Sequence, residues 1–228
     1  MNQNIPHIYD RSESMQLVRH NVLRNTYWLL ALSMIPTVLG AVVGVQLHLP
    51  VMHGMMGMLF FMAIAFGFIY AIEKTKNSGI GVAVLLAFTF FMGLMLTPIL
   101  THTLGYANGA SLIMMAFGGT ATIMAVMATV ATVSKRDFSG LGKWLFAGVI
   151  VLLVASFANI FLGLSALSMV VSVLAIAIFS AYILFDVQQI INGGETNYIS
   201  ATLRIYLDVY NIFVNLLALL GIGGGSRD

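Results

Sequence analysis

Long apolar segments alternate with short polar breaks along nearly the whole chain. Each segment is about as long as a helix that crosses the hydrocarbon of a bilayer, which takes roughly 20 residues. The segments are too long and too uniformly apolar for the strands of a membrane barrel, which alternate between lipid-facing and lumen-facing residues. The pattern predicts an all-α integral membrane protein with seven transmembrane helices, at about residues 26–47, 51–72, 80–101, 108–133, 141–162, 165–190 and 198–222.

The two ends of the chain are polar and divide it into three parts. Residues 1–24 are predicted to form a short N-terminal arm, either a surface helix or a disordered segment. This arm has no apolar core, so no cleavable signal peptide is expected. Residues 25–222 are predicted to form one transmembrane domain, and residues 223–228 a short C-terminal tail.

The composition agrees with a membrane protein and excludes several other classes. Of the 228 residues, 60% are hydrophobic and only 8% are charged, whereas a soluble domain has about 25% charged residues. There is no cysteine, so disulfides and thiolate metal sites are ruled out. The net charge of +2 comes from residues in the breaks, where membrane topology explains them. A nucleic-acid partner is therefore not expected.

The basic residues predict an orientation in the membrane. Eight of the ten lie before the first predicted helix, between the second and third, or around the break between the fourth and fifth. The positive-inside rule places these segments, and with them the N-terminus, in the cytoplasm. Seven spans then place the C-terminus outside. The eight residues are Arg11, Arg19, Arg24, Lys74, Lys76, Lys135, Arg136 and Lys143.

Two aspartates and an arginine lie inside the last two predicted helices, whose other positions are uncharged. A charge in hydrocarbon is costly, so an ionisable residue there is a candidate functional residue. At about 100° per residue, a helix over 198–222 gathers its polar side chains within an arc of roughly 80°. This stripe comprises Ser200, Arg204, Asp208, Asn211 and Asn215, and the stripe on the preceding helix comprises Ser168, Ser172, Tyr182, Asp186 and Gln189.

Two striped helices joined by a short break are expected to turn their polar faces toward each other. If Asp186 and Asp208 come within hydrogen-bonding distance, like-charge repulsion opposes ionisation of both, and the pair shares one proton. The pair would then be a proton-sensitive latch near neutral pH. However, the predicted helix ends put the two carboxylates at depths that differ by roughly 9 Å. The alternative is that Asp208 pairs with Arg204, while tyrosine or backbone groups satisfy Asp186.

The same residues resemble a known signature. Tyr182-Ile-Leu-Phe-Asp186 and Tyr206-Leu-Asp208-Val-Tyr-Asn211-Ile-Phe213 are similar to motifs of the Bax inhibitor-1 family of membrane proteins. Val22-Leu-Arg-Asn-Thr-Tyr27 and Gly193-Gly-Glu-Thr-Asn-Tyr-Ile199 resemble its bacterial YccA branch. The likeness covers essentially all seven predicted spans.

The resemblance implies a fold and a function. The fold would be six helices around a central, C-terminal seventh. The function would be a pH-dependent calcium leak gated by Asp186 and Asp208, with calcium as the permeant ion, held there only in transit. In calcium-leak relatives an arginine at the end of the second helix supports the closed latch. The corresponding stretch here is Glu73-Lys74-Thr75-Lys76, so Arg204 or a lysine would have to substitute.

The YccA branch implies a second function. Its members are associated with the membrane protease FtsH, as proteins that bind and restrain it. For this chain that would involve the N-terminal arm, residues 1–24. The branch also implies location in a bacterial inner membrane. Neither function requires an enzyme activity or a cofactor, and none is expected.

Two further functions are compatible with intramembrane aspartates. An intramembrane aspartyl protease also needs two of them, but Asp208 follows Tyr206-Leu207 rather than the Gly-x-Gly expected before that catalytic residue. A proton-coupled transporter is the other alternative. Neither of the last two predicted helices is broken at mid-membrane, as the helices of many transporter sites are.

Overall fold

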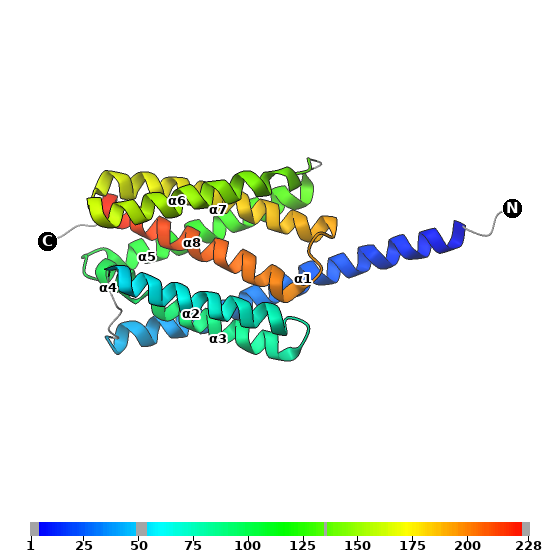
Figure 1. Cartoon of the computed structure of the whole chain (residues 1–228), viewed down its shortest axis with the longest axis horizontal. Helices are drawn as coiled ribbons and strands as arrows, with labels where there is room; N and C mark the ends of the chain where they lie inside the picture. The colour runs from blue at the N-terminus through cyan, green and yellow to red at the C-terminus, as the bar shows by residue number, and fades with distance from the viewer. Residues whose placement is uncertain (1–4, 49–53, 135, 225–228) are drawn as a thin grey trace.

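The computed structural model describes residues 5–48, 54–134 and 136–224 and is all-α over these residues (Figure 1). Seven of its helical segments are long and apolar enough to cross a membrane, as the hydropathy pattern predicts. The elements are α1 (Ile5–Gln46), α2 (Gly54–Thr75), α3 (Gly79–Met95), α4 (Thr97–Leu104), α5 (Gly109–Val133), the 3₁₀ turn η1 (Ser139–Leu141), α6 (Gly142–Leu162), α7 (Ser165–Asn192) and α8 (Tyr198–Gly224).

The third predicted span differs most from its expected form, because it is divided into α3 and α4 at Leu96. Pro98 lies in the first turn of α4, and proline has no N–H to donate to the carbonyl of Leu94. The hydroxyl of Thr97 donates to that carbonyl instead, at 2.6 Å. The break therefore leaves this carbonyl satisfied at membrane depth, as a lipid environment requires.

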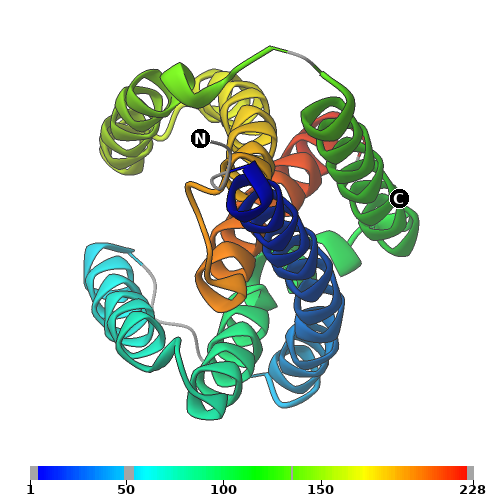
Figure 2. The same cartoon turned by 90° about the vertical axis from the view of Figure 1, so that its right-hand side faces the viewer.

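Helix α8 lies at the centre of the bundle. It packs against α7, α5, α1, α4, α3 and α2, and Figure 2 shows it, in orange to red, surrounded by the other helices. Helix α6 packs on α7. The arrangement is thus close to the six helices around a seventh that the family resemblance implies, with α6 in an outer position.

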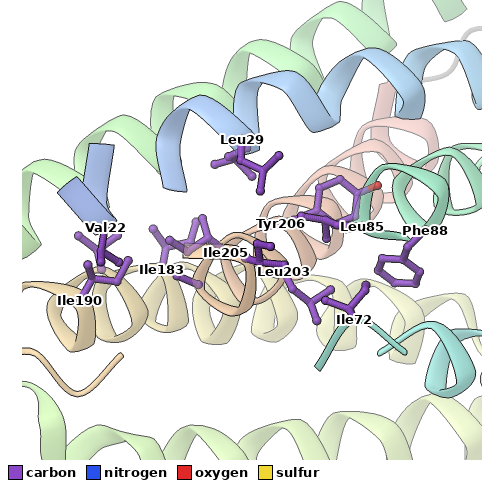
Figure 3. Packing of buried hydrophobic residues seen from close by; sticks show 14 of the residues in the cluster. Val22, Leu29, Ile72, Leu85, Phe88, Ile183, Ile190, Leu203, Ile205 and Tyr206 are labelled. Atoms are coloured by element: carbon purple, nitrogen blue, oxygen red, sulfur yellow. The ribbon is translucent and has the colours of Figure 1, made fainter. Parts of the chain in front are cut away.

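The main apolar core forms where α1, α3 and α7 meet α8. Leu29 of α1, Phe88 of α3 and Ile183 of α7 are buried in one cluster with Tyr206 of α8 (Figure 3). The Tyr206 hydroxyl shares a hydrogen bond of 2.9 Å with the hydroxyl of Thr37. The Thr89 carbonyl lies 3.4 Å from the same hydroxyl and is a second acceptor for its proton. A buried tyrosine is stable only when its hydroxyl is paired, so this residue fixes α8 to both α1 and α3.

Helix α1 is one continuous helix from Ile5 through the first membrane span. The predicted arm is therefore helical from residue 5 onward, and it projects beyond the bundle (Figure 1). The helix also continues through Pro36, which cannot donate a backbone hydrogen bond. The hydroxyls of Ser33 and Thr37 donate at 2.8 Å to the carbonyls four residues earlier, which adds polar contacts near the site of the missing N–H.

Close approach of α1 and α3 depends on glycine. A Cβ at Gly40 would collide with the carbonyl of Phe90, and one at Gly93 with the carbonyl of Thr37. A Cβ at Gly44 would collide with the hydroxyl of Thr97. The small-residue pattern of α1 thus serves packing within the chain, where small residues let membrane helices come together.

We expect Gly93→Ala to lower the melting temperature of the purified protein. The added methyl must displace backbone of α1, and overpacking of this kind costs about 1–3 kcal/mol. That corresponds to a decrease on the order of 5 °C. Gly67→Ala on α2 is the matched control, because a Cβ there meets nothing within 4 Å. Equal melting temperatures for the two variants would contradict the proposed close packing.

Candidate functional site

The turn between α7 and α8 brings their polar stripes face to face. Helix α7 ends at Asn192, and the next residue, Gly193, has a φ of +78°, which favours glycine. The Gly193 N–H donates to the carbonyl of Ile190 at 3.1 Å. The N–H groups of Gly194 and Glu195 both donate to the carbonyl of Gln189, at 2.8 and 3.1 Å. This closed C-terminal turn returns the chain so that α8 runs back along α7.

The turn places Asp186 and Asp208 together. Their side chains lie within hydrogen-bonding reach of each other, and the two residues are 7% and 5% exposed. Asp208 Oδ2 has no hydrogen-bond partner among the described residues. Helix α7 extends to Asn192, so the depth difference falls to about 6 Å at ~1.5 Å per residue. Figure 1 shows α8 slanted relative to α7, which reduces the difference further.

Tyr182 lies one helical turn before Asp186. It is half-buried and lies within electrostatic range of both carboxyl groups. Its ring packs edge to face against Phe185, with centroids 6.4 Å apart. The phenol therefore borders the pair, as the predicted stripe on this helix suggests.

Arg204 does not pair with Asp208, which removes the alternative in which this arginine satisfies it. Its guanidinium instead forms an ion pair with Glu195, with Nη2 and Oε2 3.2 Å apart. The Arg204 side chain is 51% exposed, and ion pairs of this exposure contribute about 0–1 kcal/mol. It remains within electrostatic range of both aspartates. Glu195 thus holds the Arg204 guanidinium near Asp186 and Asp208 but out of contact with them.

The other members of the predicted stripes do not bond to the carboxyl groups. The Asn211 amide donates to the Leu207 carbonyl and the Asn215 amide donates to the Asn211 carbonyl, each at 2.8 Å. Both amides therefore bond to their own helix. The side-chain oxygen of Gln189 lies against Gly194, so this residue contacts the turn.

Two polar residues that sequence reasoning did not single out anchor the site. Gln188 is buried; it accepts from the Phe138 N–H at 2.5 Å and donates to the Arg136 carbonyl at 2.6 Å. The Asn197 side chain accepts from the N–H groups of Ile199 and Ser200, which caps α8. Its amide also donates to the Lys76 carbonyl at 3.0 Å. Gln188 lies two residues after Asp186, and Asn197 lies within the Gly193–Ile199 motif, but the distant partners of both become visible only in the fold.

The end of α2 supplies no cation to the aspartates. Lys76 forms an ion pair with Glu73, with Nζ and Oε2 2.7 Å apart, and this hydrogen bond raises the pKa of Lys76 above its ordinary value. Lys74 lies over the ring of Tyr70, 5.7 Å from its centroid. In this conformation, therefore, neither lysine replaces the arginine that calcium-leak relatives have at the end of the second helix. Arg204 remains the nearest candidate.

The aspartate pair supplies only part of a calcium coordination shell. Its two carboxylates offer at most four oxygens, whereas Ca²⁺ takes about 6–8 oxygen ligands. No group of three or more histidine, cysteine or acidic residues gathers to hold a metal in the part of the chain that the structure describes. A calcium ion at this pair would need water for the remaining positions.

Comparison with known proteins agrees with the fold and with the motifs. The profile of the family described as inhibitor of apoptosis-promoting Bax1 matches residues 19–225. A protein of Escherichia coli K12 described as modulator of FtsH protease YccA is 41% identical over 93% of this chain and 94% of its own length. An uncharacterised protein of Pseudomonas aeruginosa is 39% identical over 90% of each chain. An uncharacterised membrane protein of Vibrio cholerae is 34% identical, over 94% of this chain and 96% of its own.

We expect Asn197→Ala to destabilise the turn more than Asn197→Asp. The aspartate keeps the oxygen that caps α8 and loses only the amide hydrogen bonds to the α2–α3 turn, whereas alanine loses both. Loss of a helix cap costs about 1 kcal/mol, or roughly 2–4 °C in melting temperature, and the other lost bonds add to this. Thermal unfolding followed by tryptophan fluorescence tests the order. An alanine variant as stable as the aspartate variant would show that the cap contributes nothing.

Proposed function

The chain belongs to the family described as inhibitor of apoptosis-promoting Bax1, and we propose that it is a cation leak gated by protonation of Asp186 and Asp208. The observation that carries this proposal is that the two buried carboxyl groups lie within hydrogen-bonding reach of each other inside the helix bundle. Two carboxylates that are buried together cannot both ionise cheaply. A pair of this kind therefore responds to proton concentration as a unit.

The proposed gate acts through electrostatic repulsion between α7 and α8. With one shared proton, a hydrogen bond between the carboxyl groups holds the two helices together. When the pair loses that proton, two like charges face each other where solvent screening is weak. Glu195 holds Arg204 away from them, so no contacting cation offsets the repulsion. The helices then separate, and flux is expected to rise with pH.

Calcium is the permeant ion that we propose. A fully ionised pair attracts a divalent cation and supplies the hard oxygen ligands that it prefers. Because the remaining ligands would be water, the ion is held weakly and can leave. The Tyr182 hydroxyl, near both carboxyl groups, is a further oxygen along the same path.

A second function, restraint of a membrane protease, is favoured by a separate observation. A relative that is 41% identical is described as a modulator of the FtsH protease. The first turns of α1 project from the bundle (Figure 1), where they are accessible to another protein. We propose that residues 1–24 bind FtsH. This function does not depend on ion flux, so one protein can have both.

The proposed location is a bacterial inner membrane with the N-terminus in the cytoplasm. A second relative, from Escherichia coli O6:H1, is described as an inner membrane protein. Trp28 and Trp144 are 73% and 78% exposed, near the starts of the first and fifth spans that hydropathy predicts, 26–47 and 141–162. Exposed tryptophans of this kind are typical of the membrane interface. Arg24 and Lys143 lie close to them in the sequence, which agrees with the positive-inside rule.

We expect calcium flux into liposomes that contain the purified protein to rise between pH 6 and pH 8. Asp208→Asn removes one ionisable group of the pair, so its flux should vary little over this range. The difference between the two pH profiles should be on the order of tenfold. A calcium-sensitive dye trapped in the liposomes gives the measurement.

Asp137→Asn is the matched control for this experiment. Asp137 lies outside the spans, and a hydrogen bond from the Ser139 N–H lowers its pKa below the ordinary value. It is therefore already ionised throughout the range tested, and its variant should keep the pH profile of the unmodified protein. An unchanged profile in Asp208→Asn would refute the latch. Cleavage of a helical reporter peptide that is lost in Asp186→Ala would instead support the protease alternative.

We expect deletion of residues 2–17 to abolish copurification with FtsH. The deletion removes the projecting turns of α1 and keeps Arg19, which contacts the end of α7. Deletion of residues 225–228 is the control, because it removes a similarly polar end outside the proposed binding segment. Both proteins should retain calcium flux. A complex that survives the first deletion would exclude the arm as the binding site.

A further inference from the structure

A large groove lies between α1 and α5, with α8 as its floor. The two walls do not pack directly along each other, whereas both pack on α8. The groove has a volume of about 920 Å³. Its rim includes Val38 and Val42 of α1 and Met114 and Phe117 of α5, all exposed side chains. It therefore opens sideways, toward the lipid.

The groove is lined by apolar side chains, and most of its few polar groups are hydrogen-bonded within the protein. On its floor, the Tyr206 hydroxyl is paired with Thr37, and the Tyr210 hydroxyl donates to the Met92 carbonyl at 3.2 Å. On its wall, the Thr120 hydroxyl donates to the Ala116 carbonyl at 2.7 Å. A water molecule needs about 2–4 polar partners to occupy a cavity. The groove is therefore suited to hydrocarbon.

Its length and volume match a lipid tail. Along α1 it extends from Tyr27 to Gln46, or about 28 Å at ~1.5 Å per residue, close to the roughly 30 Å of bilayer hydrocarbon. Each carbon group of a lipid tail is about the size of a water molecule, which takes roughly 30 Å³ of liquid. A chain of about 16 carbons therefore takes about 480 Å³. The cavity thus has room for one full chain and part of a second.

A free cation marks one end of the groove. Arg24 lies one turn before Tyr27 on the groove side of α1, at about 100° per residue, and His20 lies one turn earlier. Both are exposed. Among the described residues Arg24 has no ion-pair partner, whereas Arg19 points elsewhere and contacts the Ile191 carbonyl. The groove end where the basic residues gather is thus complementary to a phosphate.

We propose that this groove binds an anionic phospholipid of the surrounding bilayer, with an acyl chain between α1 and α5 and the phosphate at Arg24. The site is distinct from the aspartate pair and rests on neither proposed function. A protein helix could also fill an apolar groove. The unpartnered arginine at the membrane surface favours the lipid.

Native mass spectrometry of the full-length protein, released from detergent after incubation with a defined lipid, tests the tail site. Phosphatidylglycerol and phosphatidylcholine with the same chains are the two probes. Gly118→Leu fills the groove, because a Cβ there meets nothing within 4 Å. We expect it to reduce binding of both lipids by about tenfold, the effect of forcing a side chain into occupied space. Gly67→Leu on α2, where a Cβ also meets nothing within 4 Å, should bind as the unmodified protein does.

Arg24→Gln tests the headgroup site. The unmodified protein should prefer phosphatidylglycerol over phosphatidylcholine by about fivefold, the contribution of one basic residue at a membrane surface, and the variant should lose this preference. Lys143→Gln, at the start of α6, should keep it. An unchanged lipid ratio in Arg24→Gln would overturn the headgroup assignment.

Three other results would overturn the tail site. They are equal lipid retention by the Gly118→Leu and Gly67→Leu proteins, no lipid retained by the unmodified protein, and a bound protein in place of lipid. If Gly118→Leu fails to fold, as thermal unfolding would show, Ala121→Leu replaces it. Ala121 also lines the groove and is exposed. The same outcomes then apply.

Discussion

Two buried carboxyl groups within hydrogen-bonding reach of each other, inside a membrane-spanning bundle, are the constraint on which the rest of the structure depends. A pair of this kind persists only where the surrounding contacts hold it in place, because the charged form is costly in a medium of low dielectric. Those contacts are visible on both sides of the turn that follows Asp186. Gln188 fixes the α5–η1 loop to α7, and Asn197 caps α8 and holds the α2–α3 turn. Both residues lie outside the pair and determine where its two helices meet.

The two sides of the bundle differ in how tightly they are joined to α8. On one side, Tyr206 bonds to α1 and α3, and α1 and α3 meet through glycine at backbone distance. On the other side, α7 carries α6 on its outer surface. The α7–α8 contact includes the carboxyl pair, whose attraction depends on a proton, whereas the hydrogen bonds of Tyr206 do not. If α7 and α8 separate as proposed, the hydrogen bonds of Tyr206 keep α8 together with α1 and α3.

Hydropathy predicted the seven spans because lipid imposes a length and a polarity on every helix that crosses it. It did not predict the break at Leu96, which depends on one proline and one threonine hydroxyl. The polar stripes predicted that Asp186 and Asp208 face each other, and the two residues do meet. The sequence also allowed Arg204 to pair with Asp208, because the two residues are one turn apart on the same helix. That spacing gives no information about Glu195, which lies on the preceding turn. Glu195 holds Arg204 because Gly193 folds the chain back at that point, which is a tertiary effect.

Helix α1 connects three features that the sequence presents as separate. It begins as the projecting arm, passes Arg19 and Arg24, and then forms a wall of the lipid-facing groove. Arg19 donates to the Ile191 carbonyl at 3.4 Å and lies against Gly193, at the turn that positions the aspartates. A continuous helix transmits a displacement along its axis, so a force on the arm reaches this turn through Arg19. Arg19 therefore joins the start of the first span to the turn that positions the aspartates, so the arm and the aspartate pair belong to one connected part of the structure.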